Sequence, residues 1–272
     1  MMTFLDTILA DVREEVAASK RRRTPADIRS MCADAPPARD FAGALKGRFG
    51  LIAEVKERSP SVGPMRPENV ADAVSVYSES PAVRAVSVLT NERHFGMDIM
   101  RLGTIRKTVP QPVLRKDFFL DEYQIREARA FGADAILLMA NVLDASRLTG
   151  FHELALELGM EALFEVHTRD EIAMLPGSAR LVGINSRKFK STTGFVGEGG
   201  SSQADFSLDT SAFALASSLP AGVIRVAESG ITPESIDEVR EAFQAALVGT
   251  SLLRDPRGIR TCLADFETRI GG

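Results

Sequence analysis

The chain has 272 residues, of which 44% are hydrophobic, and its formal net charge at pH 7 is −4. This length and apolar content suit one large domain with an extensive core. No basic face for nucleic acid is evident, and no apolar run approaches the roughly 18 residues of a membrane span. The first residues lack the basic start and apolar centre of a signal peptide, so we expect a cytoplasmic protein that binds neither nucleic acid nor membranes.

The cysteines and histidines do not indicate a metal centre. Cys32 and Cys262 lie near opposite ends of the chain, which favours a reducing compartment over a disulfide framework or a thiolate metal site. His94, His152 and His167 have no metal-ligand spacing, and we interpret all three as ordinary polar residues. We therefore expect no bound metal ion.

Two helices are predicted at the start of the chain. Apolar residues between Phe4 and Ala33 recur at three- and four-residue steps, the spacing of one helix face. Thr24 and Pro25 interrupt this pattern as an N-cap and a first helical residue, so a second, shorter helix begins there. We expect residues 1–48 to form a helical extension packed on a larger body, within a single domain spanning residues 1–272.

After Gly50 the sequence alternates between apolar runs typical of buried strands and segments of helical periodicity. The strands are expected to end near Val55, Leu89, Leu114, Leu138, Val166, Ile184, Ala227 and Val248. The helices are expected over Glu68–Ser78, Met97–Thr108, Glu122–Phe131, Ala145–Leu158, Arg169–Met174, Ser211–Leu219 and Pro233–Ala242. Eight strand–helix units predict an α/β fold, a (β/α)8 barrel with extra N-terminal helices. A doubly wound open sheet is the alternative, but no Gly-x-Gly-x-x-Gly turn follows the first strand.

Glu54 and Lys56 are the first unusual pair. Residues two apart on a strand share a face, so these charges project side by side from the end of a largely buried strand. Two charges leave water at a large cost unless they pair with each other or perform chemistry. A structural ion pair and a catalytic pair are both consistent with this position.

The same pattern recurs at other strand ends, where the active sites of (β/α)8 barrels lie. The polar strand-end residues are Lys116, Asp117, Glu165, Asn185, Arg187 and Glu228. Lysines and carboxylates that converge on one mouth suit acid–base chemistry. We expect enclosure to lower the pKa of a lysine and to raise that of a carboxylate. A Schiff-base lysine is also chemically possible.

The last two strands predict a phosphate site. Ser229 and Gly230 precede an expected helix start at Thr232-Pro233, and Gly249 and Thr250 lead into another short helix. Glycines let backbone N–H groups approach an anion, and the loops after strands 7 and 8 often bind phosphate in these barrels.

Taken together, these segments resemble the indole-3-glycerol phosphate synthase family over almost the whole chain. The motifs that carry the resemblance are Ile52–Lys56, Ser59–Ser61, Ser87–Thr90, Pro112–Phe118, Ala133–Leu138, Phe164–Val166, Val182–Arg187, Ala227–Ile231 and Val248–Thr250. The resemblance implies a lyase of tryptophan biosynthesis without organic cofactor. Its substrate would be a small phosphorylated aromatic amino-sugar, 1-(2-carboxyphenylamino)-1-deoxyribulose 5-phosphate. The ring would close onto the sugar carbonyl, then CO2 and water would leave.

The resemblance also implies roles for individual residues. Lys116 would be the general acid, Glu165 the general base, and Lys56 would assist by acid catalysis or by pairing with the substrate carboxylate. Glu54, Asn185 and Glu228 would hold sugar hydroxyls and the lysines. The residues expected to bind phosphate and substrate are Ser59, Arg187, Ser229, Gly230, Gly249 and Thr250. Phe95, Phe118 and Leu137 would form the aromatic-ring pocket, although plain core packing explains them equally well.

The sequence departs from the family pattern in two places. The segment Ser191–Gln203 is longer and richer in glycine than the family pattern, and we expect it to cover the mouth. Met97 and Asp98 stand where the family usually has Gly and Ser. Two alternatives remain: a non-catalytic barrel that acts as a binding protein, and an enzyme like phosphoribosylanthranilate isomerase, which needs a cysteine on an early strand. We expect a monomer or a weak homo-oligomer.

Overall fold

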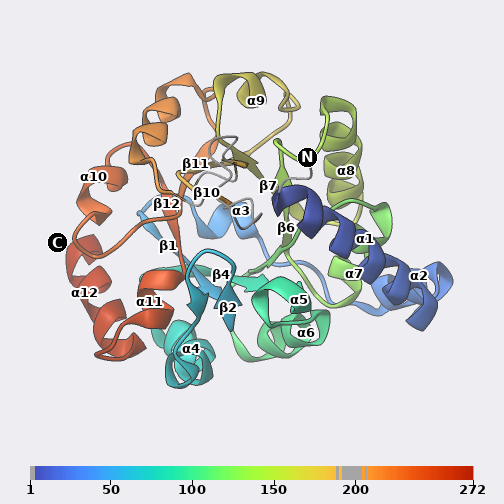
Figure 1. Ribbon diagram of the computed structural model, residues 1–272, viewed down its shortest axis with the longest axis horizontal. Helices are drawn as coiled ribbons and strands as arrows, with labels where there is room; N and C mark the ends of the chain where they lie inside the picture. Colours follow the sequence, from blue (N-terminus) through green and yellow to red (C-terminus); the bar gives the residue numbers. More distant parts are fainter. Residues whose placement is uncertain (1–3, 188–189, 192–203, 206, 272) are drawn as a thin grey trace, which may run out of the picture.

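The computed structural model describes residues 4–187, 190–191, 204–205 and 207–271. At its centre is a closed barrel of parallel strands inside a ring of helices (Figure 1). The barrel strands are β1 (Gly50–Val55), β4 (Val83–Leu89), β5 (Val113–Lys116), β6 (Ala135–Met139), β7 (Glu161–Val166), β8 (Leu181–Asn185), β11 (Ile224–Glu228) and β12 (Ala245–Val248). Each strand pairs with its neighbours in this order, and β12 pairs with β1 to close the barrel. The predicted (β/α)8 barrel is therefore confirmed.

The helices around the barrel are α4 (Pro67–Glu79), α5 (Glu92–Phe95), α6 (Ile99–Thr108), α7 (Glu122–Ala130), α8 (Ala145–Glu157), α9 (Arg169–Ala173), η1 (Thr210–Ser218), α10 (Ile236–Arg240), α11 (Thr250–Arg254) and α12 (Ile259–Gly271). Most are close to their predicted positions, but α5 and α12 were not predicted. The prediction was wrong for α10, which begins at Ile236 rather than Pro233. The backbone N–H of Thr232 donates to Ser235 Oγ at 3.0 Å, so a turn precedes the helix. The helix η1 is a 3₁₀ helix. The pattern of apolar residues over nine positions does not distinguish a 3₁₀ helix from an α-helix.

Two short antiparallel ribbons stand beyond the ends of the barrel strands. One pairs β2 (Arg58–Ser59) with β3 (Gly63–Pro64), in the connection after β1. The other pairs β9 (Lys190–Ser191) with β10 (Ala204–Asp205), after β8. Residues 192–203, most of the glycine-rich segment that we expected to cover the mouth, lie outside the described residues.

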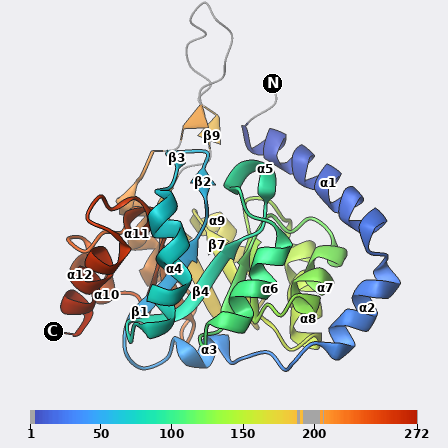
Figure 2. The same ribbon diagram turned by 90° about the horizontal axis from the view of Figure 1, so that it is seen from below.

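The extension before the barrel consists of α1 (Phe4–Arg22), α2 (Pro25–Asp34) and α3 (Phe41–Ala44). Thr24 caps α2 as predicted, since its hydroxyl accepts from the N–H of Asp27 in a capping box. Figure 2 shows α1 starting at the end of the barrel where β9 lies and α3 at the opposite end. Buried Ile8 and Val12 of α1 belong to the same apolar cluster as the residues inside the barrel, such as Ile52. This apolar continuity joins the extension to the barrel core.

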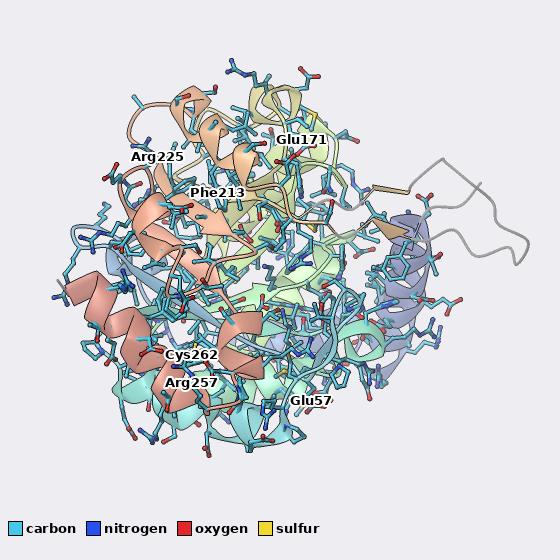
Figure 3. All side chains as sticks on the ribbon, turned by 60° about the vertical axis from the view of Figure 1, so that its left-hand side comes forward. Glu57, Glu171, Phe213, Arg225, Arg257 and Cys262 are labelled. Carbon is cyan, nitrogen blue, oxygen red and sulfur yellow. The ribbon has the colours of Figure 1, made fainter. Side chains whose placement is uncertain are left out.

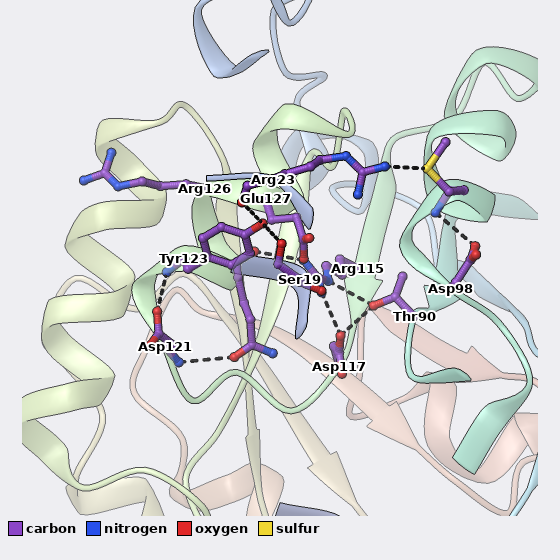
Figure 4. Close-up of polar contacts among 12 residues, drawn as sticks. Ser19, Arg23, Thr90, Asp98, Arg115, Asp117, Asp121, Tyr123, Arg126 and Glu127 are labelled. Atoms are coloured by element: carbon purple, nitrogen blue, oxygen red, sulfur yellow. Dashed lines mark hydrogen bonds and ion pairs between the residues drawn. The ribbon is translucent and has the colours of Figure 1, made fainter. Parts of the chain in front are cut away.

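Polar contacts also hold the extension against α7. Lys20 Nζ lies 2.6 Å from Asp121 Oδ2, and the hydroxyl of Tyr123 donates to the carbonyls of Ser19 and Arg23 (Figure 4). The extension is therefore fixed to the side of the barrel by groups from one helix and the loop before it.

Both cysteines are free thiols, as the sequence predicted. Cys32 lies in α2, and Cys262 is buried in α12, in the outer ring of helices (Figure 3). Neither belongs to a barrel strand.

A buried carboxylate joins the extension to the N-terminal end of the barrel. Asp134 accepts hydrogen bonds from the backbone N–H groups of Arg39 and Val113, both at 2.7 Å, and forms an ion pair with Arg106 at 3.0 Å. Each of these groups would lose its partner if the carboxylate were removed.

We predict that Asp134→Ala lowers the free energy of unfolding by about 3 kcal/mol, because it leaves the half-buried Arg106 unpaired. Urea unfolding measures this loss. Asp72→Ala, at an exposed position of α4, is the matched control and should change little. A loss no larger than that of the control would contradict the role of Asp134.

Candidate functional site

A cavity of about 500 Å³ opens at the C-terminal ends of the barrel strands. Nearly all the residues predicted from the sequence lie on its wall. They are Glu54, Lys56, Ser59, Phe95, Lys116, Phe118, Leu137, Glu165, Asn185, Arg187, Ser229, Gly230, Gly249 and Thr250. Glu228 is fully buried behind the wall, where it contacts Lys116. The strand ends thus bring together residues from across some 200 positions of sequence.

Glu54 is bound by both lysines. Its Oε1 lies 2.5 Å from Lys56 Nζ, and its Oε2 lies 3.3 Å from Lys116 Nζ. Lys116 also lies 3.2 Å from Oε2 of Glu228 on β11. The side-by-side placement of Glu54 and Lys56 is confirmed, and it is one part of a larger chain of alternating charges.

Two glycines make room for these carboxylates. A Cβ on Gly249 would lie 2.3 Å from Glu54 Oε1, and one on Gly183 would lie 1.9 Å from Glu228 Oε1. Such approaches are far below van der Waals contact, so any side chain at either position would displace a carboxylate. Both glycines belong to strands or strand ends that neighbour the carboxylate's own strand.

The charges around Lys116 reverse one expectation from the sequence. Burial alone lowers the pKa of this lysine, but Glu228, Glu54 and Glu165 outweigh burial and raise it above its usual range. The predicted lowering was therefore wrong, because enclosure places the lysine among carboxylates rather than among cations. Lys116 is a stable ammonium at neutral pH.

The carboxylates divide into two kinds. Burial opposes the ionisation of Glu54, yet Lys56 and Lys116 outweigh it and lower its pKa to about 2. Burial and the neighbouring Glu165 raise the pKa of Glu228 to about 8, against the opposing effect of Lys116. Oε1 of Glu165 and Oε1 of Glu228 have no hydrogen-bond partner among the described groups. The raised pKa means that the carboxyl group of Glu228 holds a proton near neutral pH.

One end of the cavity presents backbone groups suited to an anion. Ser229 has φ of 69° and Gly230 has φ of 72°, and Ser229 is the non-glycine residue with positive φ in the described chain. Ser186 Oγ holds this turn by donating to the Ser229 carbonyl at 3.0 Å. Strained backbone of this kind concentrates at functional sites. After the neighbouring strand β12, α11 begins at Thr250 as predicted, whereas no helix begins directly after Gly230.

The opposite wall is apolar. Phe95, Phe118 and Leu137 line the cavity, together with Leu89 and Met139. Phe118 and Leu137 are also buried members of the cluster inside the barrel, so they pack in the core and face the cavity at once. The interpretation of these residues as a pocket wall and their interpretation as core packing are therefore compatible.

Met97 and Asp98, which depart from the family pattern, are not among the described residues that line this cavity. Met97 is buried in the outer apolar cluster. Asp98 caps α6, since Oδ1 accepts from the backbone N–H groups of Met100 and Arg101. Both positions have structural roles in the loop after β4.

Sequence analysis missed a buried network behind Lys116. Arg115 is directed to the outer side of β5, where it lies 2.9 Å from Asp117 Oδ2 and 3.0 Å from Glu127 Oε2 (Figure 4). Thr90 Oγ1 donates to the same oxygen of Asp117 at 2.7 Å. Asp117, which the sequence grouped with the mouth, does line the cavity, and its carboxylate is paired with Arg115. The alternation of side chains along β5 could have revealed this, since Arg115 and Lys116 must face opposite ways.

Sequence analysis also did not single out His167. This residue follows β7 and lies 3.7 Å from Glu165 through its Nε2. Its spacing of two residues from Glu165 places both on the same side of the strand end, which was the available signal.

Comparison with known proteins places this chain in a family. A family model described as indole-3-glycerol phosphate synthase matches residues 5–260. The chain is 40% identical over 268 residues to the indole-3-glycerol phosphate synthase of Kineococcus radiotolerans, covering 94% of this chain and 93% of the relative. It is 40% identical over 258 residues to the protein of that name from Chlorobium phaeovibrioides, covering 92% and 95%.

The chain belongs to the indole-3-glycerol phosphate synthase family. Solved structures at lower identity agree with the fold alone. A 3-hexulose-6-phosphate synthase has a TM-score of 0.55 at 14% identity, covering 82% of this chain and all of that one. An N-(5'-phosphoribosyl)anthranilate isomerase from Pyrococcus furiosus has a TM-score of 0.54 at 11% identity, covering 82% and 98%.

Two further observations concern the described residues of this synthase-family chain. No group of three His, Cys, Asp or Glu side chains among them is arranged to hold a metal ion. None of their helices is long and apolar enough to cross a membrane.

We predict that Gly249→Ala lowers turnover and stability together, because the added Cβ would displace Glu54 from the two lysines. Initial rates and thermal unfolding measure both effects. Gly150→Ala is the matched control. Its Cβ meets nothing within 4 Å, and it should stabilise α8 by about 0.5–1 kcal/mol without changing turnover. Parent-like turnover and stability of Gly249→Ala would show that Glu54 does not need this space.

Proposed function

We propose that the protein forms indole-3-glycerol phosphate from 1-(2-carboxyphenylamino)-1-deoxyribulose 5-phosphate in tryptophan biosynthesis. The observation that carries this proposal is Lys116. It is an ammonium held among carboxylates on the wall of a cavity with one apolar side and one side of backbone donors. Membership of the synthase family supports the same reaction.

Lys116 is the general acid of ring closure. The ring carbon that bears the carboxylate attacks the ketone carbon of the sugar, and Lys116 protonates the ketone oxygen. Its raised pKa keeps the proton on the lysine until the oxygen develops negative charge. Lys56, held by Glu54, pairs with the substrate carboxylate or assists this proton transfer.

Glu165 is the general base of the later steps. The ring regains its aromaticity when the carboxylate leaves as CO2. The new hydroxyl then leaves as water with a second proton, while Glu165 removes a proton from the five-membered ring. Two protons enter and one leaves, so each turnover consumes one proton, because a carboxylate anion departs as a neutral molecule.

The remaining predicted residues bind and orient. The backbone N–H groups near Gly230 and Gly249, with Ser59, Ser229 and Thr250, hold the phosphate. Arg187 and Asn185 contact the sugar phosphate and its hydroxyls, and Glu228 holds Lys116 in place. Phe95, Phe118 and Leu137 enclose the aromatic ring of the substrate.

The alternatives fit the site less well. A binding protein descended from a synthase would not need the complete set of Glu54, Lys56, Lys116 and Glu165. An isomerase would need a cysteine on an early strand, whereas the two cysteines lie in α2 and α12. We further propose that residues 1–48 and the barrel act as one domain, in the cytoplasm, where both thiols stay reduced.

We predict that Lys116→Met lowers kcat by about 10²–10⁴-fold, the usual effect of losing a general acid. Formation of the indole product, followed by its fluorescence, measures turnover. Lys107→Met, at an exposed position in α6, is the matched control and should keep parent turnover.

Lys116→Arg tests the chemistry separately from the fold. It keeps a positive charge between Glu54 and Glu228, but a guanidinium does not give up its proton near neutral pH. We expect it to remain folded and inactive. Parent-like turnover of either Lys116 variant would refute the proposed role, and an inactive parent would refute the proposed reaction.

A further inference from the structure

His167 lies directly behind the proposed general base. Its side chain is 15% exposed, and Nε2 lies 3.7 Å from Oε1 of Glu165, whose side chain is 1% exposed. Both of these atoms are buried and have no hydrogen-bond partner among the described groups. The imidazole therefore faces the one oxygen of Glu165 that nothing else satisfies.

The other side of the ring is held by Glu171 of α9. Oε2 of Glu171 accepts from the backbone N–H of His167 at 2.6 Å and lies 3.3 Å from Nδ1 of the ring. Thr168 begins α9 by accepting from the N–H of Glu171. One carboxylate thus fixes both the backbone and the ring of His167. Figure 3 shows Glu171 on this side of the barrel.

The charges around the ring favour an imidazolium. Burial lowers the pKa of His167, but Glu171 and Glu165, with a smaller effect of Glu228, outweigh burial and raise the pKa above the ordinary value of 6.5. Lys116 is a further cation that interacts with the carboxylates of this pair, and it lies 3.2 Å from Oε2 of Glu228. The imidazolium of His167 thus lies between two carboxylates, that of Glu171 on one side and that of Glu165 on the other.

We propose that His167, oriented by Glu171, is a positioning residue that keeps the carboxylate of Glu165 ionised and directed into the cavity. His167 is not among the described residues that line the cavity, so it acts through Glu165 rather than on the substrate. The need for it arises because Lys116 pairs with Glu54 and Glu228, whereas the ion pair of Glu165 among the described residues is with His167. This inference rests on the proposed function of Glu165.

The test compares His167→Gln with the parent over a range of pH. Glutamine places an amide N–H near the position of Nε2 but carries no charge. Without the imidazolium, the carboxylate pair takes up a proton more readily. The acid limb of the kcat/KM profile should therefore move to higher pH by about one unit, and kcat/KM on that limb should fall roughly tenfold.

Two more variants separate charge from structure. Glu171→Gln keeps an acceptor for the backbone of His167 but removes the negative charge, so it should move the acid limb in the same direction by less. His152→Gln is the matched control. It removes another buried imidazole, which packs edge-on against Phe164 of the same strand at 5.1 Å, and it should leave the profile unchanged.

A measurement without turnover keeps the inference independent of the reaction. The chain has three histidines, so imidazole NMR signals can be assigned with single glutamine variants. Glu165→Gln should lower the pKa of His167, because it removes one of the carboxylates that stabilise the imidazolium. The pKa of His152 should not change.

The outcomes distinguish the two proposals. An inactive parent whose His167 still responds to Glu165→Gln would refute the proposed reaction and leave the charge coupling intact. An active parent whose pH profile is unchanged by His167→Gln would overturn the role of His167. The role of His167 would also be overturned if Glu165→Gln left the pKa of His167, measured by NMR, unchanged.

Discussion

The site depends on one carboxylate that binds two lysines inside the barrel. Glu54 comes from the first barrel strand, and it can reach Lys56 and Lys116 at once only because Gly249, on the adjacent strand end, has no side chain. Two buried charges, Glu54 and Lys56, and the largely enclosed Lys116 are tolerable here because each has a partner at contact distance. Glu228 contacts Lys116 from the other side, at 3.2 Å. The remaining groups of the mouth are arranged around this chain of charges.

Lys116 is positioned by contacts on both sides of β5, the cavity side and the outer side that faces the helices. The preceding residue, Arg115, points outward into a buried network with Asp117 and Glu127, which ties β5 to α7. Consecutive residues of a strand face opposite ways, so the outward arginine fixes the backbone from which the inward lysine projects. Two consecutive charged residues of β5 therefore have different partners: Arg115 contacts the outer helix α7, and Lys116 contacts the carboxylates of the mouth.

Much of this arrangement was predictable from the sequence because the C-terminal ends of all the barrel strands lie at the same end of the barrel. Each strand that ends in a charge delivers that charge to the same mouth, so Glu54, Lys56, Lys116 and Glu165 could be brought together without coordinates. The apolar runs predicted the strands within two residues of their observed ends. On the proposed phosphate side, the start of α11 after Gly249 was predictable, but the turn that delays α10 was not.

What the sequence did not predict was interaction between elements distant in the chain. The pKa of Lys116 was expected to fall, because the sequence shows that it is enclosed but not that its nearest neighbours are carboxylates. His167 appeared ordinary for a similar reason, since its function depends on Glu171 from the next helix. The pKa of a buried group depends on the distances to its charged neighbours, and the pattern of apolar residues in a sequence does not give these distances.

The central claim is that Glu54 and Lys116 stabilise each other as buried ions. A double-mutant cycle with Glu54→Gln and Lys116→Met, read as the free energy of unfolding at pH 7, tests it most directly. Glu54→Gln leaves Lys56 without its carboxylate partner. Lys116→Met removes the lysine that Glu54 and Glu228 share, so we expect each single variant to lose about 3 kcal/mol or more. The double variant removes both charges and should be more stable than the sum of the single losses predicts, by at least about 1 kcal/mol. Additive losses would contradict the account, because they would mean that the two groups do not interact.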